Sequence, residues 1–193
     1  MSLPYVDSRQ LGAGMVYLLT APTVATSSAF DGSIALLYGA LDNAQAGSAV
    51  VSSDVDHDGY LDLIIGAPGE KDNRGSAYVI RGPVAGNTVL YRGAGGRIIG
   101  EDSGDAFAAS LAVLPSGELL VGAPDSGQGA GAVYQLWGPL SGVALARDGH
   151  RIDGAVGSSF GSSLAVAPGR GWVVVGAPTD DNDVGSVHLL EIP

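Results

Sequence analysis

The sequence contains no cysteine among its 193 residues. Disulfides, thiolate metal sites and cysteine nucleophiles are therefore excluded. No stretch approaches the ~18 apolar residues of a transmembrane helix, so we expect no membrane insertion. Charged residues make up only 15% of the chain, and their balance is acidic, with a formal net charge of −11. Because an acidic domain repels phosphate backbones, nucleic acid is not an expected partner.

Glycine, in contrast, is abundant, with 31 copies beside 10 prolines and 46% apolar residues. The glycines follow no collagen-like period, and no amphipathic helical stripe of useful length is present. Short Val/Ile/Leu runs separated by glycine-rich turns are typical of many short strands. The composition therefore predicts an all-β domain, and the length is sufficient for a substantial core.

The tripeptide Gly-Ala-Pro recurs at residues 66–68, 122–124 and 176–178, at spacings of 56 and 54 residues. Each copy follows a short apolar run and precedes a polar loop and a glycine-led strand. Each repeat thus contains an inner strand (A), a strand ending in Gly-Ala-Pro (B), a third strand (C) and a fourth (D). Four short antiparallel strands in about 55 residues indicate one blade of a β-propeller.

The remaining strands follow from the alignment of the repeats. The D position belongs to residues 88–91 or 97–99 in one repeat and to residues 143–152 in the next. Residues 12–22 have the pattern of a C strand, and residues 34–38 follow as D. The predicted inner strands are residues 46–51, 107–113 and 160–166.

This alignment divides the chain into a little over three blades. Residues 1–40 hold the outer strands of a partial blade, residues 41–99 and 100–153 form complete blades, and residues 154–193 form a blade without its last strand. Closed propellers usually have about 4–8 blades, so one chain leaves the ring incomplete. Exposed blade faces and strand edges favour association. We therefore expect either a fragment of a longer protein or a homodimer that shares blades at the chain ends and completes a six- or seven-bladed ring.

The repeat resembles a known family. A Phe-Gly pair, a variable loop and Gly-Ala-Pro are the marks of the FG-GAP repeat of integrin α-subunit N-terminal β-propellers and their bacterial relatives. Residues 160–161 with 176–178 carry both halves intact, whereas Ala108 replaces the glycine of the second pair and Ala46 the phenylalanine of the first. The resemblance implies a seven-bladed propeller of about twice this length, calcium in the A–B loops, and ligand or partner binding at an extracellular or cell-surface location.

One A–B loop is longer than the others. From the second residue of the Phe-Gly position to the glycine of Gly-Ala-Pro, the distance is 19 residues in the first repeat, against 14 and 15 in the other two. Loops 114–118 and 167–171 are predicted to be ordinary short turns. The long loop instead carries alternating oxygen donors, namely the side chains of Asp54, Asp56, Asp58 and Asp62 and the backbone carbonyl of Tyr60.

These donors match positions 1, 3, 5, 9 and 7 of a calcium-binding loop, and Gly59 permits the turn between them. Carboxylates this close repel one another unless a cation joins them, so a solvated acidic turn is the weaker interpretation. The all-oxygen donor set suits Ca²⁺ better than Mg²⁺ or zinc. An EF-hand is rejected because Ile65 occupies position 12. His57 falls out of phase and is predicted to face solvent.

The predicted function is therefore a non-catalytic, calcium-binding propeller module that binds a protein or glycan ligand, as in adhesion. An accessory propeller domain of a secreted or surface enzyme is the alternative. No Ser-His-Asp spacing and no convergent acid/base cluster is evident outside the calcium loop. We therefore expect no catalytic residues and no organic cofactor, and we interpret residues 71–74 and 180–183 as solvated loops.

Overall fold

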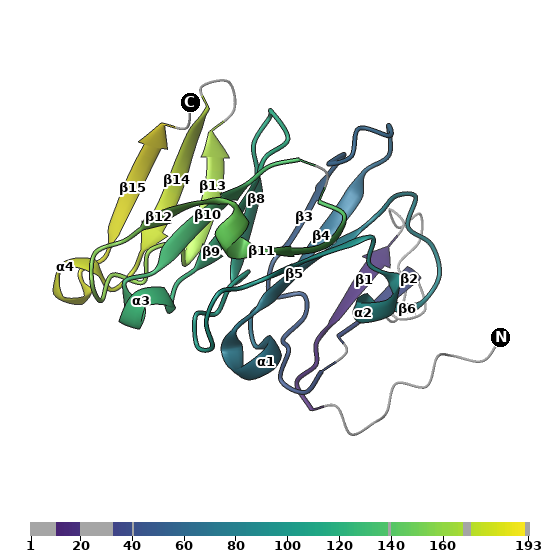
Figure 1. The fold of residues 1–193 in the computed structure, drawn as a ribbon, viewed down its shortest axis with the longest axis horizontal. Helices are drawn as coiled ribbons and strands as arrows, with labels where there is room; N and C mark the ends of the chain where they lie inside the picture. Colours follow the sequence, from purple (N-terminus) through teal and green to yellow (C-terminus); the bar gives the residue numbers. More distant parts are fainter. Residues whose placement is uncertain (1–10, 20–32, 40, 139, 168–170, 192–193) are drawn as a thin grey trace.

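The protein is all-β. The computed structural model describes residues 11–19, 33–39, 41–138, 140–167 and 171–191. Within these ranges, fifteen strands form four sheets that stand side by side in chain order (Figure 1). Helical segments in the described ranges are single turns, and three of them follow Gly-Ala-Pro: α1 (Glu70–Asn73), α3 (Ser126–Gly129) and α4 (Asp180–Asp183).

Two sheets contain the predicted antiparallel order A–B–C–D. The first contains β3 (Val50–Ser53), β4 (Asp62–Ala67), β5 (Ser76–Ile80) and β7 (Gly96–Ile99) in this order, and a fifth strand, β11 (Gly142–Leu145), pairs in parallel beyond β7. The second consists of β8 (Ser110–Val113), β9 (Leu119–Ala123), β10 (Ala132–Leu136) and β12 (His150–Asp153). Each B strand ends at the alanine of Gly-Ala-Pro, because the proline that follows has no backbone N–H for the ladder. The A–B loops of both sheets lie at the same edge of the molecule (Figure 1).

The two end sheets each have three strands in the described ranges. The C-terminal sheet consists of β13 (Ser163–Ala167), β14 (Trp172–Ala177) and β15 (Ser186–Glu191), which are strands A, B and C. The N-terminal sheet contains β1 (Met15–Leu19) and β2 (Ser33–Tyr38), which are strands C and D, followed by β6 (Thr88–Val89). Part of the predicted first blade, including residues 20–22 of its C strand, lies outside the described residues.

The connection from strand C to strand D crosses to the neighbouring sheet. After β5, strand β6 pairs in parallel with β2 of the preceding blade, and α2 (Leu90–Gly93) then leads back to β7. After β10, strand β11 (Gly142–Leu145) likewise pairs in parallel with β7. Of the two candidates for the first D strand, residues 97–99 are therefore correct. Residues 88–89 belong to the adjacent sheet.

The prediction of one D strand over residues 143–152 is wrong. The segment contains two strands in two sheets, separated by the single turn η1 (Ala146–Asp148). The turn forms because the Asp148 carboxylate accepts a hydrogen bond from the Leu145 N–H at 3.2 Å and because Ala146 is fully buried. Each crossover of this kind ties two neighbouring blades by backbone hydrogen bonds.

The inner strands begin later than predicted. They start at Val50, Ser110 and Ser163, three or four residues after the Phe-Gly position. That position instead forms a turn with positive φ, 69° at Ala108 and 91° at Gly161. The residue before the turn pairs through an isolated parallel bridge with the preceding blade, as in Gly75–Phe107 and Gly131–Phe160.

The two halves of the repeat motif touch each other across neighbouring blades. Gly122 accepts a hydrogen bond at its carbonyl from the Ala108 N–H of its own blade at 2.9 Å. A Cβ added at Gly122 would lie 2.1 Å from the Gly161 carbonyl oxygen of the next blade, and one at Gly66 would lie 2.2 Å from the Ala108 carbonyl oxygen. The glycine of Gly-Ala-Pro is thus needed because the backbone of the next blade occupies the space of a side chain.

The core consists of three clusters of buried apolar side chains. Phe107 is fully buried in the central cluster, and its ring meets the ring of Tyr134 edge-on at 5.4 Å between centroids. Aromatic pairs in this arrangement add to the stability gained from burial. The central cluster also contains Val79 and Ile98 of the preceding blade, so the phenylalanine of the motif joins successive blades.

An arginine on each complete D strand reaches a buried polar network. Arg97 Nη2 lies 2.6 Å from the carboxylate of Glu70, which also accepts a hydrogen bond from the Tyr78 hydroxyl at 2.8 Å. In the next blade, Arg151 lies 2.7 Å from Glu101 and 2.9 Å from the Tyr134 hydroxyl oxygen. Burial, followed by the charge of Glu70, raises the pKa of Tyr78 far above its ordinary value.

Candidate metal centre

The long A–B loop, residues 54–61 between β3 and β4, gathers three carboxylates. One carboxylate oxygen from each of Asp54, Asp56 and Asp58 lies within 4.8 Å of the other two. Asp54 and Asp56 are half-buried, and Asp58 is exposed. Three hard oxygen donors at this separation can contact one divalent ion, and carboxylate oxygens are ligands that calcium prefers. The structure thus brings together the first three predicted ligands.

Backbone N–H groups hold these carboxylates in place. The Asp58 and Gly59 N–H groups donate to the two oxygens of Asp54 at 3.1 and 3.0 Å, and the Tyr60 N–H donates to Asp58 at 2.8 Å. The chain turns through positive φ at His57 (61°) and Gly59 (89°). Nothing lies within 4 Å of a Cβ built at Gly59, so its φ and not lack of space favours glycine. His57 is exposed, as predicted.

Asp62, the fourth predicted carboxylate, lies outside this group. It is fully buried at the start of β4, where Oδ2 accepts the Val55 N–H at 3.1 Å and Oδ1 accepts the Gly82 N–H at 2.9 Å. Both oxygens therefore already hold backbone donors. The side chain fixes the start of the long A–B loop against the residues that follow β5.

Arg81 is a neighbour of the site that the sequence analysis missed. Its Nη1 lies 3.1 Å from Oδ2 of Asp56, and its side chain is 46% exposed. No sequence pattern identifies this pair, because it depends on the antiparallel register of β4 and β5. Because the Arg81 side chain is largely solvated and an ion pair with an exposed partner contributes only about 0–1 kcal/mol, Arg81 can leave Asp56 to a metal ion at little cost.

The comparison with known families matches the same part of the chain. The sequence model of the FG-GAP repeat covers residues 46–80, which include β3, the long A–B loop, β4 and β5. This segment is therefore similar to an FG-GAP repeat. No curated protein matches the chain significantly.

The FG-GAP repeat, together with the four-stranded sheets, confirms the predicted all-β fold built from propeller-type blades. FG-GAP repeats occur in extracellular or surface proteins. In the described part of the chain, no helix is long and apolar enough to cross a membrane.

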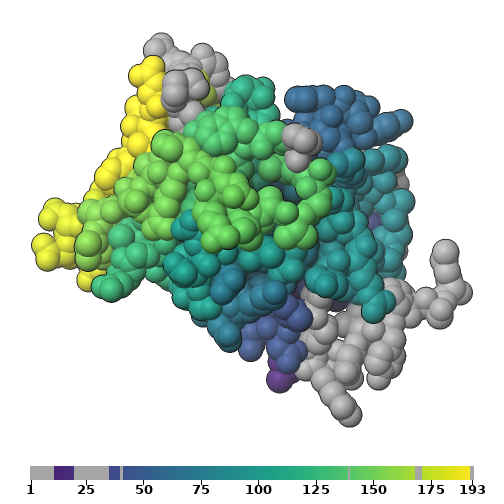
Figure 2. Space-filling model, in the orientation of Figure 1, coloured from purple at the N-terminus to yellow at the C-terminus, as the bar shows by residue number. Residues whose placement is uncertain are grey.

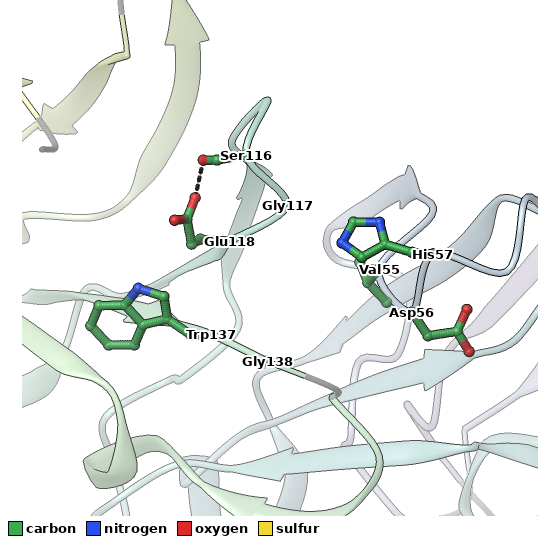
Figure 3. Close-up of a pocket in the computed structure, with 8 residues that line it drawn as sticks. All are labelled: Val55, Asp56, His57, Ser116, Gly117, Glu118, Trp137 and Gly138. Carbon is green, nitrogen blue, oxygen red and sulfur yellow. Dashed lines mark hydrogen bonds between the residues drawn. The ribbon is translucent and has the colours of Figure 1, made fainter.

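A pocket of about 290 Å³ adjoins the long A–B loop (Figure 3). The loop supplies Asp56 and His57 to one side, and the next blade supplies Glu118 and the indole of Trp137 to the other. Trp137 is 54% exposed, and Glu118 accepts a hydrogen bond from the Ser116 hydroxyl. The pocket offers an aromatic surface and polar groups, as small-ligand sites do, and the long A–B loop forms one of its walls.

The corresponding loop of the next blade is a tight turn, as predicted. The Leu114 N–H donates to the Glu118 carbonyl at 2.9 Å, and the Gly117 N–H donates to the Leu114 carbonyl at 2.8 Å. Most of the third loop, residues 168–170, lies outside the described residues. Across the residues that the structure describes, the group at Asp54, Asp56 and Asp58 is the single cluster with metal-binding spacing.

Proposed function

We propose that the protein is a non-catalytic, calcium-binding β-propeller module that binds a protein or glycan ligand at an extracellular or cell surface. The observation that carries this proposal is the convergence of Asp54, Asp56 and Asp58 in the one extended loop. The match of this segment to the FG-GAP repeat supports it. The pocket beside Trp137 is the proposed ligand contact, because an exposed indole next to an ordered loop offers a rigid apolar surface.

The proposed calcium ligands are the carboxylates of Asp54, Asp56 and Asp58 and the backbone carbonyl of Tyr60. Asp62 contributes a direct ligand only by sharing an oxygen with the N–H of Val55 or Gly82. Calcium takes ~6–8 oxygens, so waters complete the shell. The ion neutralises clustered charge and fixes the loop, which is a structural role.

Calcium is expected to raise the melting temperature. An ion that binds only the folded state stabilises it by about 3–4 kcal/mol at 100–1,000 times its dissociation constant. We expect this stabilisation in calorimetry of the chain with calcium, and its loss in EDTA. The variants Asp54→Asn and Asp58→Asn should lose most of the calcium-dependent shift.

Asp125→Asn is the matched control, since it removes an exposed carboxylate from a turn outside the calcium loop. Its calcium-dependent shift should equal that of the unaltered chain. Asp62→Asn distinguishes a calcium ligand from a side chain that only holds the backbone. If Asp62 only holds the backbone, the variant lowers stability equally with and without calcium. The calcium site would be refuted by a melting temperature that is the same in calcium and in EDTA.

We also propose that two copies associate and complete a six- or seven-bladed ring. The outward face of β15 exposes Val187 (74%) and Leu189 (56%), and β1 at the other end exposes Tyr17 (42%) and Leu19 (49%). In Figure 2 the C-terminal sheet, in yellow, forms one end of the molecule. In a ring of two copies joined head to tail, the β15 face of each copy would pack against the β1 face of the other. Such apolar patches favour association in water.

The expected result is a dimer mass in sedimentation equilibrium at micromolar concentration. Val187→Lys combined with Leu189→Lys should shift the protein to monomer, because charged side chains would then be placed in the contact. Val143→Lys, at an exposed position away from both end faces, is the control. A monomer mass for the unaltered chain would refute the dimer.

A further inference from the structure

The two complete sheets share a pattern where strand D meets strand C. Arg97 lies opposite Tyr78 in one sheet, and Arg151 lies opposite Tyr134 in the other. An isoleucine follows each arginine in the sequence. Each arginine reaches a carboxylate, at 2.6 Å in the first sheet and 2.7 Å in the second.

A glycine ends the same pattern. The Gly100 N–H donates to the Gly75 carbonyl at 3.1 Å, and the Gly154 N–H donates to the Gly131 carbonyl at 2.9 Å. A Cβ at Gly100 would lie 2.2 Å from the backbone oxygen of Arg74, and the corresponding distance at Gly154, to the oxygen of Ala130, is 2.4 Å. The complete D strand is therefore Arg-Ile-x-Gly, and its glycine cannot carry a side chain.

The C-terminal sheet contains the receiving half of this pattern. Gly185 immediately precedes β15, as Gly75 precedes β5, and His188 lies in β15 at the position that Tyr78 has in β5. Asp180 takes the place of Glu70, and its carboxylate accepts the Ser186 hydroxyl at 2.5 Å and lies 3.4 Å from His188. Among the described residues, no strand pairs with the outer edge of β15.

A second edge next to β15 is also open. The D strands of the two preceding sheets each have a parallel neighbour, since β6 pairs with β2 and β11 pairs with β7. Strand β12 has no such neighbour in the described ranges. In both earlier cases the parallel strand and the arginine-bearing strand belong to one continuous segment.

We propose that the outer edge of β15 binds an extended polypeptide segment of the pattern Arg-(Ile/Leu)-x-Gly, antiparallel to β15 and with its arginine opposite His188. The segment adds the fourth strand, the arginine reaches Asp180, and the glycine N–H donates to the Gly185 carbonyl. Residues that precede the arginine lie along β12. Strand addition of this kind gains affinity from backbone hydrogen bonds and specificity from alternate side chains.

Charge and side-chain contacts favour this occupant. The hydrogen bond from Ser186 lowers the pKa of Asp180, so a carboxylate faces the incoming guanidinium at neutral pH. Arg97 and Arg151 lie over the rings of Tyr78 and Tyr134 at 5.3 and 5.5 Å, and the His188 ring is the corresponding surface in β15. Strand β2 has Leu36 at the arginine position, so the described D strand of a second copy lacks the charge. The inference is independent of calcium and of face-to-face dimerisation.

The chain itself supplies the probe. A fluorescent peptide with the sequence of residues 142–154 contains both parts of the segment, and its binding to the intact chain can be followed by anisotropy. We expect saturable binding, reduced about tenfold or more when leucine replaces the peptide arginine that corresponds to Arg151, with Arg147 kept in both peptides, as for loss of a charged hydrogen bond. Asp180→Asn in the chain should weaken the arginine peptide but not the leucine peptide, which gives a coupling in the double-mutant cycle.

Two controls separate strand addition from attraction between opposite charges. Asp183→Asn removes the same charge from an exposed position in the same turn and should leave binding unchanged. A peptide with valine in place of its last glycine keeps its charge and should lose binding. Absence of binding, equal affinity of the arginine and leucine peptides, or full binding by the valine peptide would each overturn the proposal. If a second copy of the chain occupies the edge of β15, the arginine peptide binds no better than the leucine peptide, and this outcome also overturns the proposal.

Discussion

Phe107→Ala is expected to lower the free energy of unfolding by about 3–5 kcal/mol. Phe107 is fully buried, with a solvent-exposed fraction of 0%, and packs against Tyr134 in the cluster between two blades. Its backbone also pairs with Gly75 of the preceding blade, so the residue cannot move to fill the space left by the ring. The loss therefore includes the transfer of the ring and the cavity that remains.

Denaturant unfolding of the variant and of the unaltered chain measures this difference. Val156→Ala, at a position 88% exposed in the loop before Phe160, should change the free energy of unfolding by no more than about 0.5 kcal/mol. A loss below ~1 kcal/mol for Phe107→Ala would contradict the placement of this ring at the centre of the blade contact.

Arg97→Met should cost about 3–5 kcal/mol, because it leaves the carboxylate of Glu70 buried without its cation. The side chains of Arg97 and Glu70 are only 11% and 1% exposed. The Tyr78 hydroxyl remains as a hydrogen-bond donor to Glu70, but a neutral donor does not balance the charge. Thermal and denaturant unfolding at neutral pH measure the effect.

Arg151→Met is the matched comparison within the same chain. Arg151 and Glu101 are 30% and 23% exposed, so solvent screens the remaining carboxylate and the cost should be only about 1–2 kcal/mol. Adding Glu70→Gln to Arg97→Met removes the buried charge and should restore part of the stability. Equal losses for the two arginine variants would show that burial of the partner does not set the cost.

Local sequence determined the repeating part of this fold. The apolar run, Gly-Ala-Pro and the glycine-led strand predicted β4, β9 and β14 and the C strands after them. These strands are adjacent in the chain and paired through short turns, so the pattern of a few neighbouring residues is enough to define them. The alternating aspartates likewise placed Asp54, Asp56 and Asp58 together, because one tight loop contains all three.

Tertiary structure decided the features that depend on distant parts of the chain. Residues 143–152 divide between two sheets because β7 of the preceding blade offers a parallel edge to β11. Arg81 meets Asp56, and Asp62 holds the Gly82 N–H, only because β4 and β5 pair in one particular register. Such contacts leave no period in the sequence, because each is set by the register in which two strands pair and not by the residues of one strand. The sequence alone therefore identifies the blades and the loop of clustered aspartates, and the packing of blades determines how they are joined.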